Sequence, residues 1–359
     1  MTKSYSILGL MSGTSLDGLD LAYCQIWQED ANYKFKIKKT KSISYSREMQ
    51  TKLKNSIHLA ADELLIFHNT YGTWLGEQAN IFIKENDLEV DAIASHGHTT
   101  HHQPENGLTF QIGSGQHLAN ASNQKVICDF RTNDVALGGQ GAPLVPIGDK
   151  LFFSNYTFCL NLGGISNVSF EKDDKRIAYD IGLANMILNY ITRKNGIDYD
   201  DGGEIAKSGT INLMMLERLN ALEYYKLPIP KSIGYEWFVK EVAPIVDRTE
   251  DNMENLLCTS VHHICEQVSN QIKAHCNTNE NSLFVTGGGA LNEFLIEVLR
   301  NKLGAEIKVV PTSKQLIEFK EALVFALMGV LRLENKINVL KSVTGAVTNS
   351  SSGVIFLPC

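Results

Sequence analysis

The chain opens with Ile7-Leu8-Gly9-Leu10-Met11-Ser12-Gly13-Thr14-Ser15-Leu16-Asp17-Gly18-Leu19-Asp20-Leu21-Ala22-Tyr23. Two apolar runs flank a turn rich in glycine and hydroxyl groups, a pattern that predicts a β-hairpin. Gly13 and Gly18 can adopt positive φ and leave room for a ligand close to the backbone. The turn between them offers amides, two hydroxyls and the carboxylate of Asp17, which could cradle phosphate oxygens and a hydrated Mg²⁺. The alternative interpretation is a hairpin whose polar turn binds nothing.

A second strand–turn–strand pattern follows about 150 residues later, the length of one domain. It reads Phe158-Cys159-Leu160-Asn161-Leu162-Gly163-Gly164-Ile165-Ser166-Asn167-Val168-Ser169-Phe170. Each copy precedes alternating strands and helices, which favours a duplicated α/β domain over a chance match between glycine turns. Two such domains would form a cleft, and ligands favour clefts between domains.

Composition limits the class of protein. The 359 residues are 43% hydrophobic and 20% charged, which is typical of globular proteins with two to three domains. A net charge of −7 disfavours nucleic acid and anionic membranes as partners. The seven cysteines form no C-x-x-C pair, which predicts reduced thiols in the cytoplasm and argues against zinc. No apolar run approaches a signal sequence or a membrane span.

Hydrophobic periodicity predicts the main helices. They are expected at Arg47–Ile57 with Ser46 as N-cap, at 62–86, at Met253–Ala274 and at Glu321–Leu333. Residues 129–146 contain three glycines and two prolines and are expected to form a loop that crosses between domains. We therefore expect a first domain over 1–130, with 336–359 as a candidate completion, and a second domain over 131–335.

Two stretches of the second half carry candidate chemistry. Gly287, Gly288 and Gly289 follow a predicted strand and precede a helix, where a phosphate could approach unpaired amides; a tight turn is the alternative. Asp180 ends a predicted strand beside Gly182, a usual place for a functional group in an α/β sheet. It could act as a general base, or it could cap the helix that begins near Asn185.

Candidate polar groups in the first half and near the end are less specific. The four histidines at 96, 98, 101 and 102 suggest a metal cluster, yet no nearby carboxylate or cysteine supports them as a ligand set, which favours ordinary imidazoles at the edge of a substrate cleft. Arg131 could clamp a carboxylate or phosphate, or lie on the surface. Glu321 could favour the dipole of the last helix, or serve as a buried functional carboxylate.

Taken together, these motifs resemble the anhydro-N-acetylmuramic acid kinase family of the actin and hexokinase superfamily. The matching segments run in order along nearly the whole chain: Gly9–Asp20, His96-Gly97, Asp129-Phe130-Arg131, Ala136–Pro146, Asn161–Asn167, Pro230-Lys231-Ser232, Gly287–Gly289, Glu321-Ala322-Leu323 and Ser342–Ala346. The 9–20 and 136–146 blocks are the most specific.

The resemblance implies two actin/hexokinase-type (RNase H-like) α/β domains around an ATP cleft. ATP would be bound by Gly13, Thr14, Ser15, Leu16, Asp17, Gly18, Leu19, Asp20, Gly163, Gly164, Gly287, Gly288 and Gly289. Asp180 would be the catalytic base that activates a water, and the sugar would contact His96, Arg131 and Glu321. Mg²⁺ would assist, with Asp17 as its candidate ligand. The implied activity hydrolytically opens 1,6-anhydro-N-acetylmuramic acid and phosphorylates O6 during cell-wall recycling.

The chain departs from the family pattern in four places. Residues 180–185 read Asp-Ile-Gly-Leu-Ala-Asn where Asp-Thr-Gly-Pro-Gly-Asn is common, so a hydroxyl is lost. Residues 233–238 lack the family's arginine, Gly202 interrupts an Asp-Gly-Glu motif, and His98 replaces a glutamine. These changes leave two alternatives open: a kinase of a related amino sugar, and a sensor that binds ATP without transferring phosphate. The sequence does not fix the oligomeric state, and a homodimer is one option.

Overall fold

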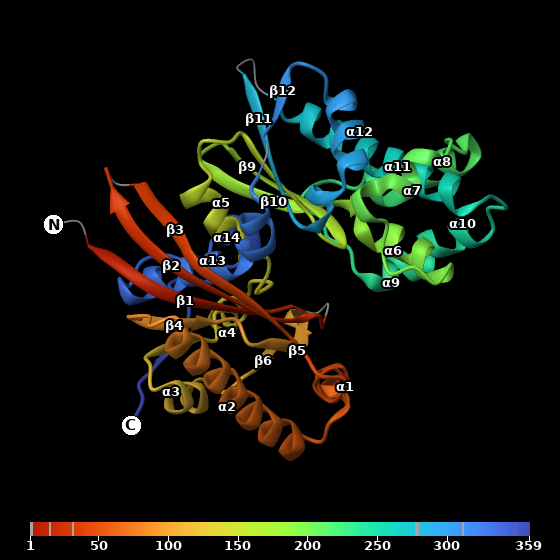
Figure 1. Ribbon diagram of the computed structural model, residues 1–359. Coiled ribbons are helices and arrows are strands. Elements are labelled where there is room, and N and C mark those ends of the chain that lie inside the picture. The colour runs from red at the N-terminus through yellow and green to blue at the C-terminus, as the bar shows by residue number, and fades with distance from the viewer. Residues whose placement is uncertain (1–2, 14–15, 31, 277–279, 311) are drawn as a thin grey trace. The chain divides into compact units, whose positions relative to one another are not determined.

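The structure is a computed structural model that describes residues 3–13, 16–30, 32–276, 280–310 and 312–359. The chain divides into two compact units. The first consists of the residues up to Phe152 together with Phe319–Cys359, and the second is Phe153–Glu318. Each unit is an α/β structure with its own sheet (Figure 1). No helix in the described ranges is both long and apolar enough to cross a bilayer.

The first unit contains a six-stranded sheet in the order β13-β7-β4-β1-β2-β3. Its strands are β1 (Ser4–Ser12), β2 (Gly18–Glu29), β3 (Asn32–Ser44), β4 (Ala92–Ser95), β7 (Val126–Cys128) and β13 (Val354–Phe356). The first three form an antiparallel meander, β4 and β7 continue the sheet in parallel, and β13 closes it antiparallel to β7. A separate two-stranded ribbon joins β5 (His98–Gln103) to β6 (Leu108–Ile112).

The second unit repeats this arrangement in the order β10-β9-β8-β11-β12. Its strands are β8 (Phe158–Leu162), β9 (Ile165–Lys172), β10 (Lys175–Leu183), β11 (Asn281–Thr286) and β12 (Ile307–Val310). Again three strands form an antiparallel meander, and two more extend it in parallel from the first of them. The shared order confirms the predicted fold class, because both glycine turns join the first two strands of the same topology.

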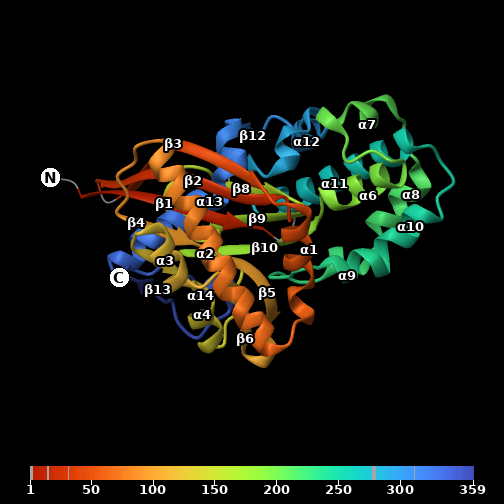
Figure 2. The same cartoon turned by 60° about the horizontal axis from the view of Figure 1, so that its bottom comes forward.

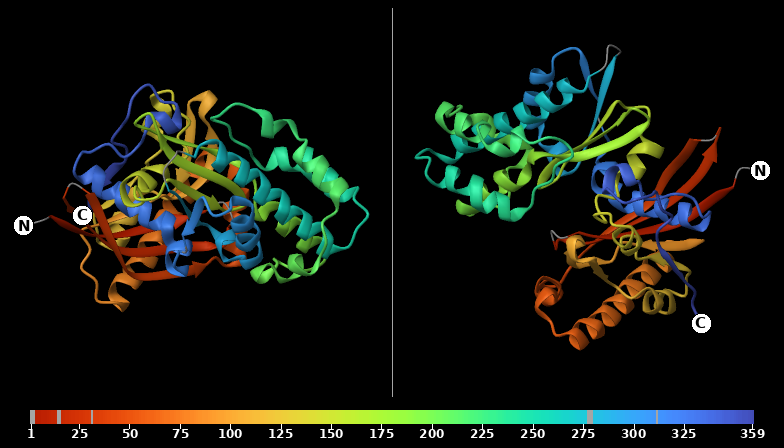
Figure 3. Two further views of the ribbon diagram at one scale, coloured as in Figure 1. Left: turned by 90° about the horizontal axis from the view of Figure 1, so that it is seen from above. Right: turned by 180° about the vertical axis from the view of Figure 1, so that it is seen from behind.

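Helices cover both faces of the first sheet. They are α1 (Arg47–Asn55), α2 (Ala61–Glu85), α3 (Gly115–Ser122), α4 (Thr132–Ala136), α5 (Pro146–Phe152), α13 (Lys314–Leu333) and α14 (Lys341–Thr344). Side chains alternate along β1, so Leu8 and Leu10 join the core beneath α2 while Gly9 faces α13. Figure 3 shows α2 and α3 together on one side of the strands of this unit and α13 on the other.

The contact between β1 and α13 leaves no room for a side chain at position 9. A Cβ on Gly9 would lie 2.0 Å from the carbonyl oxygen of Ala322. We therefore expect Gly9→Ala to lower the free energy of unfolding of this unit by about 3 kcal/mol, the upper range for overpacking. Urea unfolding measures the loss. Gly107→Ala is the control, because a Cβ there meets no atom within 4 Å and costs only the strain of its φ of 70°. Equal losses in the two variants would contradict the close packing.

Helices of the second unit pack around α11 (Met253–Ala274), which has the bounds that its apolar stripe predicts. The others are α6 (Asn185–Lys194), α7 (Glu204–Ser208), α8 (Leu213–Asn220), α9 (Tyr235–Trp237), α10 (Ala243–Asp247) and α12 (Glu293–Leu303). Figure 2 shows α6 and α8 beside α11. The buried core of this unit includes Leu257, Val261 and Ile264 of α11 and Leu160 and Val285 of the sheet.

The boundaries between the two units lie at other residues than the sequence analysis predicts. The expected boundaries at 130 and 335 both fall inside the first unit, whose limits are Phe152 and Phe319. Two contacts explain the difference. Gly148 of α5 lies against Val324 of α13, and α13 itself packs on β1 and β4 through Ala322 and Gly329. Residues 336–359 also belong to the first unit, through the pairing of β13 with β7.

Candidate functional site

The opening hairpin is formed by β1 and β2, which residues 13–17 connect. Thr14 and Ser15 lie outside the described residues. Asp17 is exposed, and the carbonyl of Leu16 accepts a hydrogen bond from Gln50 Nε2 at 3.2 Å. Asp17 is thus open to solvent in a turn that α1 anchors from the side.

Residues 18–20, at the start of β2, make packing and hydrogen-bond contacts within the first unit. A Cβ on Gly18 would lie 2.4 Å from the carbonyl oxygen of Ile43 on β3, so this glycine permits the β2–β3 contact. Leu19 is buried, and the Asp20 carboxylate accepts from Ser42 Oγ at 2.5 Å. The nucleotide role of residues 13–20 therefore stays a prediction, and it rests most naturally on the exposed end of the turn.

A buried hydrogen-bonded chain supports the start of the turn at Ser12. Tyr45 donates its hydroxyl to Ser12 Oγ at 2.8 Å, and the hydroxyls of Tyr45 and Tyr71 are 2.7 Å apart. Ser12 Oγ also lies 3.1 Å from Nδ1 of His98. Burial lowers the pKa of His98 to about 4, so this imidazole is neutral at pH 7. His98, which replaces a glutamine of the family pattern, thus supports the end of β1 through its contact with Ser12.

His96 has a different partner from His98 because β5 begins only at His98 and Gly97 adopts a φ of 71°. Nε and Nη2 of Arg131 lie 3.0 Å and 2.9 Å from Nε2 of His96. The other ring nitrogen, Nδ1, lies 2.9 Å from the carbonyl oxygen of Gly97, which can only accept. Nδ1 therefore carries the proton, Nε2 accepts from Arg131, and His96 is neutral. Burial first, and then the charge of Arg131, hold the pKa of His96 well below its ordinary value.

The loop before Pro146 is built around a carboxylate that sequence reasoning missed. Asp134 is fully buried; it accepts from the amide of Gly141 at 2.8 Å and from Thr344 Oγ1 at 2.7 Å. The carbonyl of Gly141 in turn accepts from Nη1 of Arg131 at 2.6 Å. A Cβ on Gly139 would lie 2.2 Å from Asp134 Oδ2. This segment, expected to be a loop, contains α4 and holds the guanidinium of Arg131 through the carbonyl of Gly141.

Glu321 lies within α13 and not at its start, because the helix begins at Lys314. The expected role at the helix dipole is therefore wrong. The residue is exposed, yet burial of its carboxyl, together with the charge of Asp20, raises its pKa against the lowering charges of Arg131 and Lys320. The pKa of Arg131 is about 10, lowered by burial and partly restored by the carboxylates of Glu321 and Asp134. The structure thus gathers Arg131, His96, Glu321 and Asp20 in the first unit, as a polar cluster suited to an anionic or hydroxyl-rich ligand.

The buried neutral histidines make the first unit sensitive to acid. His96 and His98 have folded pKa values below the unfolded value of about 6.5, so below that pH the unfolded chain binds more protons. We expect the free energy of unfolding to fall by roughly 2.4 kcal/mol per pH unit between pH 6 and 5 from these two imidazoles, about half from each, with smaller contributions from His68 and His102, whose pKa values burial also lowers. Urea unfolding at several pH values measures this slope. His98→Gln should remove about half of it, and an unchanged slope in that variant would contradict the assignment.

Asp180, the predicted base, lies inside β10, which continues past it to Leu183. The β9–β10 register shifts between Asp180 and Gly182, so a bulge follows the carboxylate. The amide of Ile233 donates to Asp180 Oδ2 at 3.1 Å, and the amide of Asp180 donates to the carbonyl of Lys231 at 2.9 Å. Burial raises the pKa of Asp180 to about 6, against a lowering by the Ile233 amide. Asp180 caps no helix, because α6 has Ala184 at its N-cap. A carboxylate with this pKa suits a general base near neutral pH.

Two residues near Asp180 were missed by sequence reasoning. Tyr224 donates its hydroxyl to the carbonyl of Asp180 at 2.6 Å. Lys231 is buried, donates to the carbonyl of Tyr224 at 2.9 Å and lies 4.5 Å from the centre of that tyrosine ring. The resemblance to the family includes Pro230-Lys231-Ser232 without a role for its lysine, and in the structure this lysine supports the backbone around Asp180.

The glycine turns of the second unit come together around Asn185. The carbonyls of Gly163 and Gly164 accept from the amides of Asn185, Ala184 and Met186, so the turn is docked on the start of α6. A Cβ on Gly289 would lie 2.7 Å from Leu162 Cβ and 3.4 Å from Asn185 Oδ1. Gly288 and Gly289 lie in a short 3₁₀ helix, and α12 begins at Glu293 with Asn292 as its N-cap, so the glycines precede this helix as expected. Their proximity permits a shared nucleotide site within this unit.

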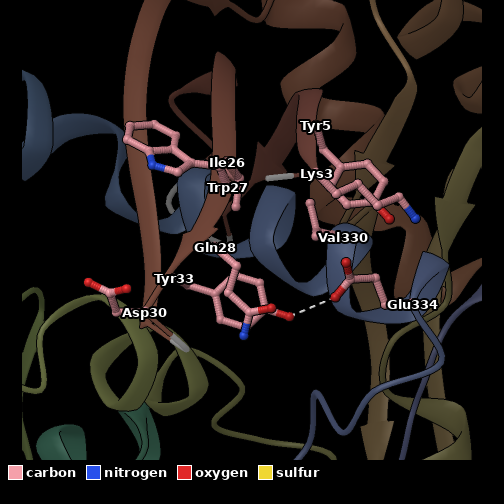
Figure 4. Close-up of a pocket in the computed structure, with 9 residues that line it drawn as sticks. All are labelled: Lys3, Tyr5, Ile26, Trp27, Gln28, Asp30, Tyr33, Val330 and Glu334. Atoms are coloured by element: carbon pink, nitrogen blue, oxygen red, sulfur yellow. Dashed lines mark hydrogen bonds between the residues drawn. The ribbon is translucent and has the colours of Figure 1, made fainter. Parts of the chain in front are cut away.

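Two pockets help to locate the chemistry. Figure 4 shows one of about 400 Å³ beside Tyr5, Tyr33 and Glu334, where Tyr33 donates to Glu334 at 2.7 Å. It lies at the start of β1, and none of the predicted site residues that the structure describes lines it. The other pocket, of about 720 Å³, includes Tyr224 and Ile233, two of the residues that hydrogen-bond to Asp180. This second pocket adjoins the candidate base.

Comparison with known proteins gives a consistent result. A family model described as anhydro-N-acetylmuramic acid kinase matches residues 5–358. The chain is 33% identical to the anhydro-N-acetylmuramic acid kinase of Sulfurimonas denitrificans, over 97% of this chain and 98% of the relative. It is 33% identical to the protein of the same name from Haemophilus influenzae, over 99% and 98%. A solved structure, the activator of the 2-hydroxyisocaproyl-CoA dehydratase from Clostridium difficile with bound ADPNP, is 11% identical with a TM-score of 0.43, over 93% of this chain and 97% of that one. The family match and the two relatives confirm the resemblance drawn from the sequence.

Proposed function

The chain belongs to the anhydro-N-acetylmuramic acid kinase family, and from this premise we propose how its residues carry out the reaction. The enzyme opens the 1,6-anhydro bridge of anhydro-N-acetylmuramic acid with water and transfers a phosphoryl group from ATP to O6. The products are N-acetylmuramic acid 6-phosphate and ADP. The observation that carries the proposal is Asp180, a partly buried carboxylate that an amide holds in place and whose pKa of about 6 suits proton transfer.

In the proposed reaction, Asp180 accepts a proton from water as the water oxygen bonds to the anomeric carbon C1. The bond between C1 and O6 breaks, and its electron pair stays on O6. This oxygen then bonds to the γ-phosphorus of ATP, and the bond from that phosphorus to the β–γ bridging oxygen breaks, which releases ADP. The bulge after Asp180 and the hydrogen bond from the amide of Ile233 keep the carboxylate in one orientation during the first step.

We assign sugar binding to Arg131, His96 and Glu321. Arg131 would face the lactyl carboxylate of the sugar, because a guanidinium forms paired hydrogen bonds with a carboxylate. His96 is neutral and already accepts from Arg131, so we give it the task of orienting the guanidinium rather than transferring a proton. Glu321 is exposed in the described part of the first unit and can accept from sugar hydroxyls.

We assign phosphate contacts to residues 13–20 of the first unit, where Asp17 is exposed, and nucleotide contacts of the second unit to the glycines at 163–164 and 287–289. Among the described residues no three histidine, cysteine or acidic side chains gather as a metal site. This fits Mg²⁺, which commonly takes one or two carboxylates and completes its shell with phosphate oxygens and water. Asp17 is the carboxylate that we assign, and bound Mg²⁺ would supply neutralisation of phosphate charge. The scattered cysteines support a cytoplasmic location, where anhydro sugars from the cell wall would be recycled.

The test is incubation of the purified protein with ATP, Mg²⁺ and the anhydro sugar in water enriched in ¹⁸O. We expect ADP and a sugar 6-phosphate that carries one ¹⁸O at C1. Product from N-acetylglucosamine but not from the anhydro sugar would favour a kinase of a related amino sugar. Nucleotide binding without transfer to any sugar of such a panel would favour a sensor and contradict the proposal.

A further inference from the structure

Two neighbouring tyrosines contact the short segment that carries Asp180. Both lie in the 3₁₀ helix Glu223–Lys226. Tyr224 donates its hydroxyl to the carbonyl oxygen of Asp180 at 2.6 Å. Tyr225 lies against the other end of the bulge, where a Cβ on Gly182 would be 2.8 Å from Tyr225 Cε1 and 3.0 Å from its hydroxyl oxygen. The bulge between Asp180 and Gly182 is therefore held at both of its ends.

The Tyr225 ring is itself fixed by a buried histidine of α11. Its hydroxyl lies 2.8 Å from Nε2 of His263, which is 1% exposed. Nδ1 of His263 lies 2.6 Å from Oδ1 of Asn220, and Gln267 Nε2 donates to the same oxygen at 2.9 Å. Because the amide oxygen can only accept, Nδ1 carries the proton and Nε2 accepts from the hydroxyl of Tyr225. A directed chain thus runs from Tyr225 through His263 to Asn220 at the end of α8.

This chain has one protonation state over the working range of the enzyme. Burial lowers the pKa of His263 to about 3 and raises that of Tyr225. Neither group changes its proton near neutral pH, so the hydrogen bonds keep their direction while Asp180 titrates. The ring of Tyr225 therefore keeps one position in its contact with Gly182.

From this geometry we propose that Tyr225 and His263 are positioning residues for Asp180, which hold the bulge after it and thereby the direction of its carboxylate. The inference rests on the proposed function, in which Asp180 is the base. Neither residue need touch the substrate. Displacement of a catalytic group by about 1 Å can cost on the order of 100-fold in rate, so a wall that prevents such a shift has a large effect.

Variants of Tyr225 and His263 separate the contact from the hydrogen bond. Tyr225→Phe keeps the ring against Gly182 and should lower kcat only about 5-fold, whereas Tyr225→Ala opens that face and should lower kcat about 100-fold. His263→Leu removes the partner of the hydroxyl and should fall between them. His263→Gln keeps a polar partner for the hydroxyl and should restore part of the loss. The KM for ATP should stay within about twofold, since these residues act on the base alone.

The pH profile provides a readout that a loss of folding would not move. Burial is the main cause of the raised pKa of Asp180. The ammonium of the nearby Lys231 donates to the carbonyls of Tyr224 and Tyr225. A loosened bulge admits water, and the acid limb of kcat should move from about pH 6 towards the ordinary value of 3.8 in Tyr225→Ala and His263→Leu.

The control is Tyr179→Phe. Tyr179 precedes Asp180 on the same strand and donates to Gln271 of α11 at 2.9 Å, so this variant loses a comparable hydrogen bond to the same helix. Its acid limb should stay at about pH 6. An acid limb unmoved in Tyr225→Ala and His263→Leu, or moved equally in Tyr179→Phe, would overturn the inference. If Tyr225→Ala fails to fold, the contrast between His263→Leu and His263→Gln decides.

A second measurement separates the inference from the proposed function. The carboxyl carbon of Asp180 can be titrated by ¹³C NMR without any turnover. Absence of activity on the anhydro sugar in the unchanged protein would reject the proposed function and leave this titration as the test. If the carboxyl group of Asp180 still titrates at about pH 6 in Tyr225→Ala and His263→Leu, the positioning role of Tyr225 and His263 is rejected, whatever the substrate is.

Discussion

Asp180→Asn will lower the rate of anhydro sugar phosphorylation by roughly 10³-fold, within the range for loss of a general base. The asparagine oxygen can still accept from the amide of Ile233 at the position of Oδ2, so the bulge and the local fold should persist. What is lost is the ability to take a proton from water. Because the pKa of Asp180 is about 6, kcat of the unchanged enzyme should rise through pH 6 and level off above it.

Steady-state assay of ADP release measures the effect, and nucleotide affinity of the variant should remain within about threefold. Asp247→Asn is the matched control. Asp247 is a half-exposed carboxylate of the same unit, paired with Lys194 at 2.5 Å and bonded to Tyr190, and its loss should leave the rate nearly unchanged. Full activity of Asp180→Asn would remove the base from the mechanism.

Lys320→Met will destabilise the first unit by about 4 kcal/mol, the usual cost of leaving a buried charge without its partner. Nζ of Lys320 lies 2.7 Å from Oδ1 of Asp149, and the two side chains are 6% and 7% exposed. The pair joins α13 to α5, close to the two places where the chain leaves and re-enters this unit. Hydrogen exchange of the β1 and β4 amides reports the stability of this unit by itself.

The double variant Asp149→Leu/Lys320→Met tests the cause of that loss. It should recover most of the stability, because two apolar side chains leave no unpaired charge. Lys52→Met is the surface control: Lys52 and Glu48 are 2.7 Å apart but 57% and 76% exposed, so the loss of stability should be far smaller than that of Lys320→Met. If the buried and surface variants lost equal stability, the ion pair would not be the origin of the effect.

The parts of the fold that depend on local pattern were predictable from the sequence. The apolar stripe of α11 marks both of its ends, and Ser46 is the N-cap of α1 as expected, accepting from the amide of Met49 at 3.1 Å. The repeated hairpins also predicted the duplicated topology. The start of α13 was missed because its first residues, Lys314 to Lys320, are mostly polar and interrupt the apolar pattern.

The parts that depend on contacts between distant residues were not predictable. Asp134 reads as an ordinary loop acid, and only its bond to Thr344, 210 residues away, shows that it organises the loop beside Arg131. His263 lies on a helix face whose apolar stripe masks it, and its partner Tyr225 comes from another element. The resemblance supplied candidate residues such as Asp180, but not the groups that set their orientation.

The two crossings of the chain at Phe152 and Phe319 also bear on synthesis by the ribosome. The second unit is one continuous segment, so all of its strands and helices emerge before the chain is complete. The first unit cannot be completed at that stage, because α13, which covers β1 and β4, and β13, which pairs with β7, follow the second unit in the sequence. The nascent chain therefore holds an unfinished N-terminal sheet, with β7 unpaired by β13, while the later segment is already able to fold. Newly made protein should for this reason be most prone to aggregation before the segment Phe319–Cys359 has left the ribosome.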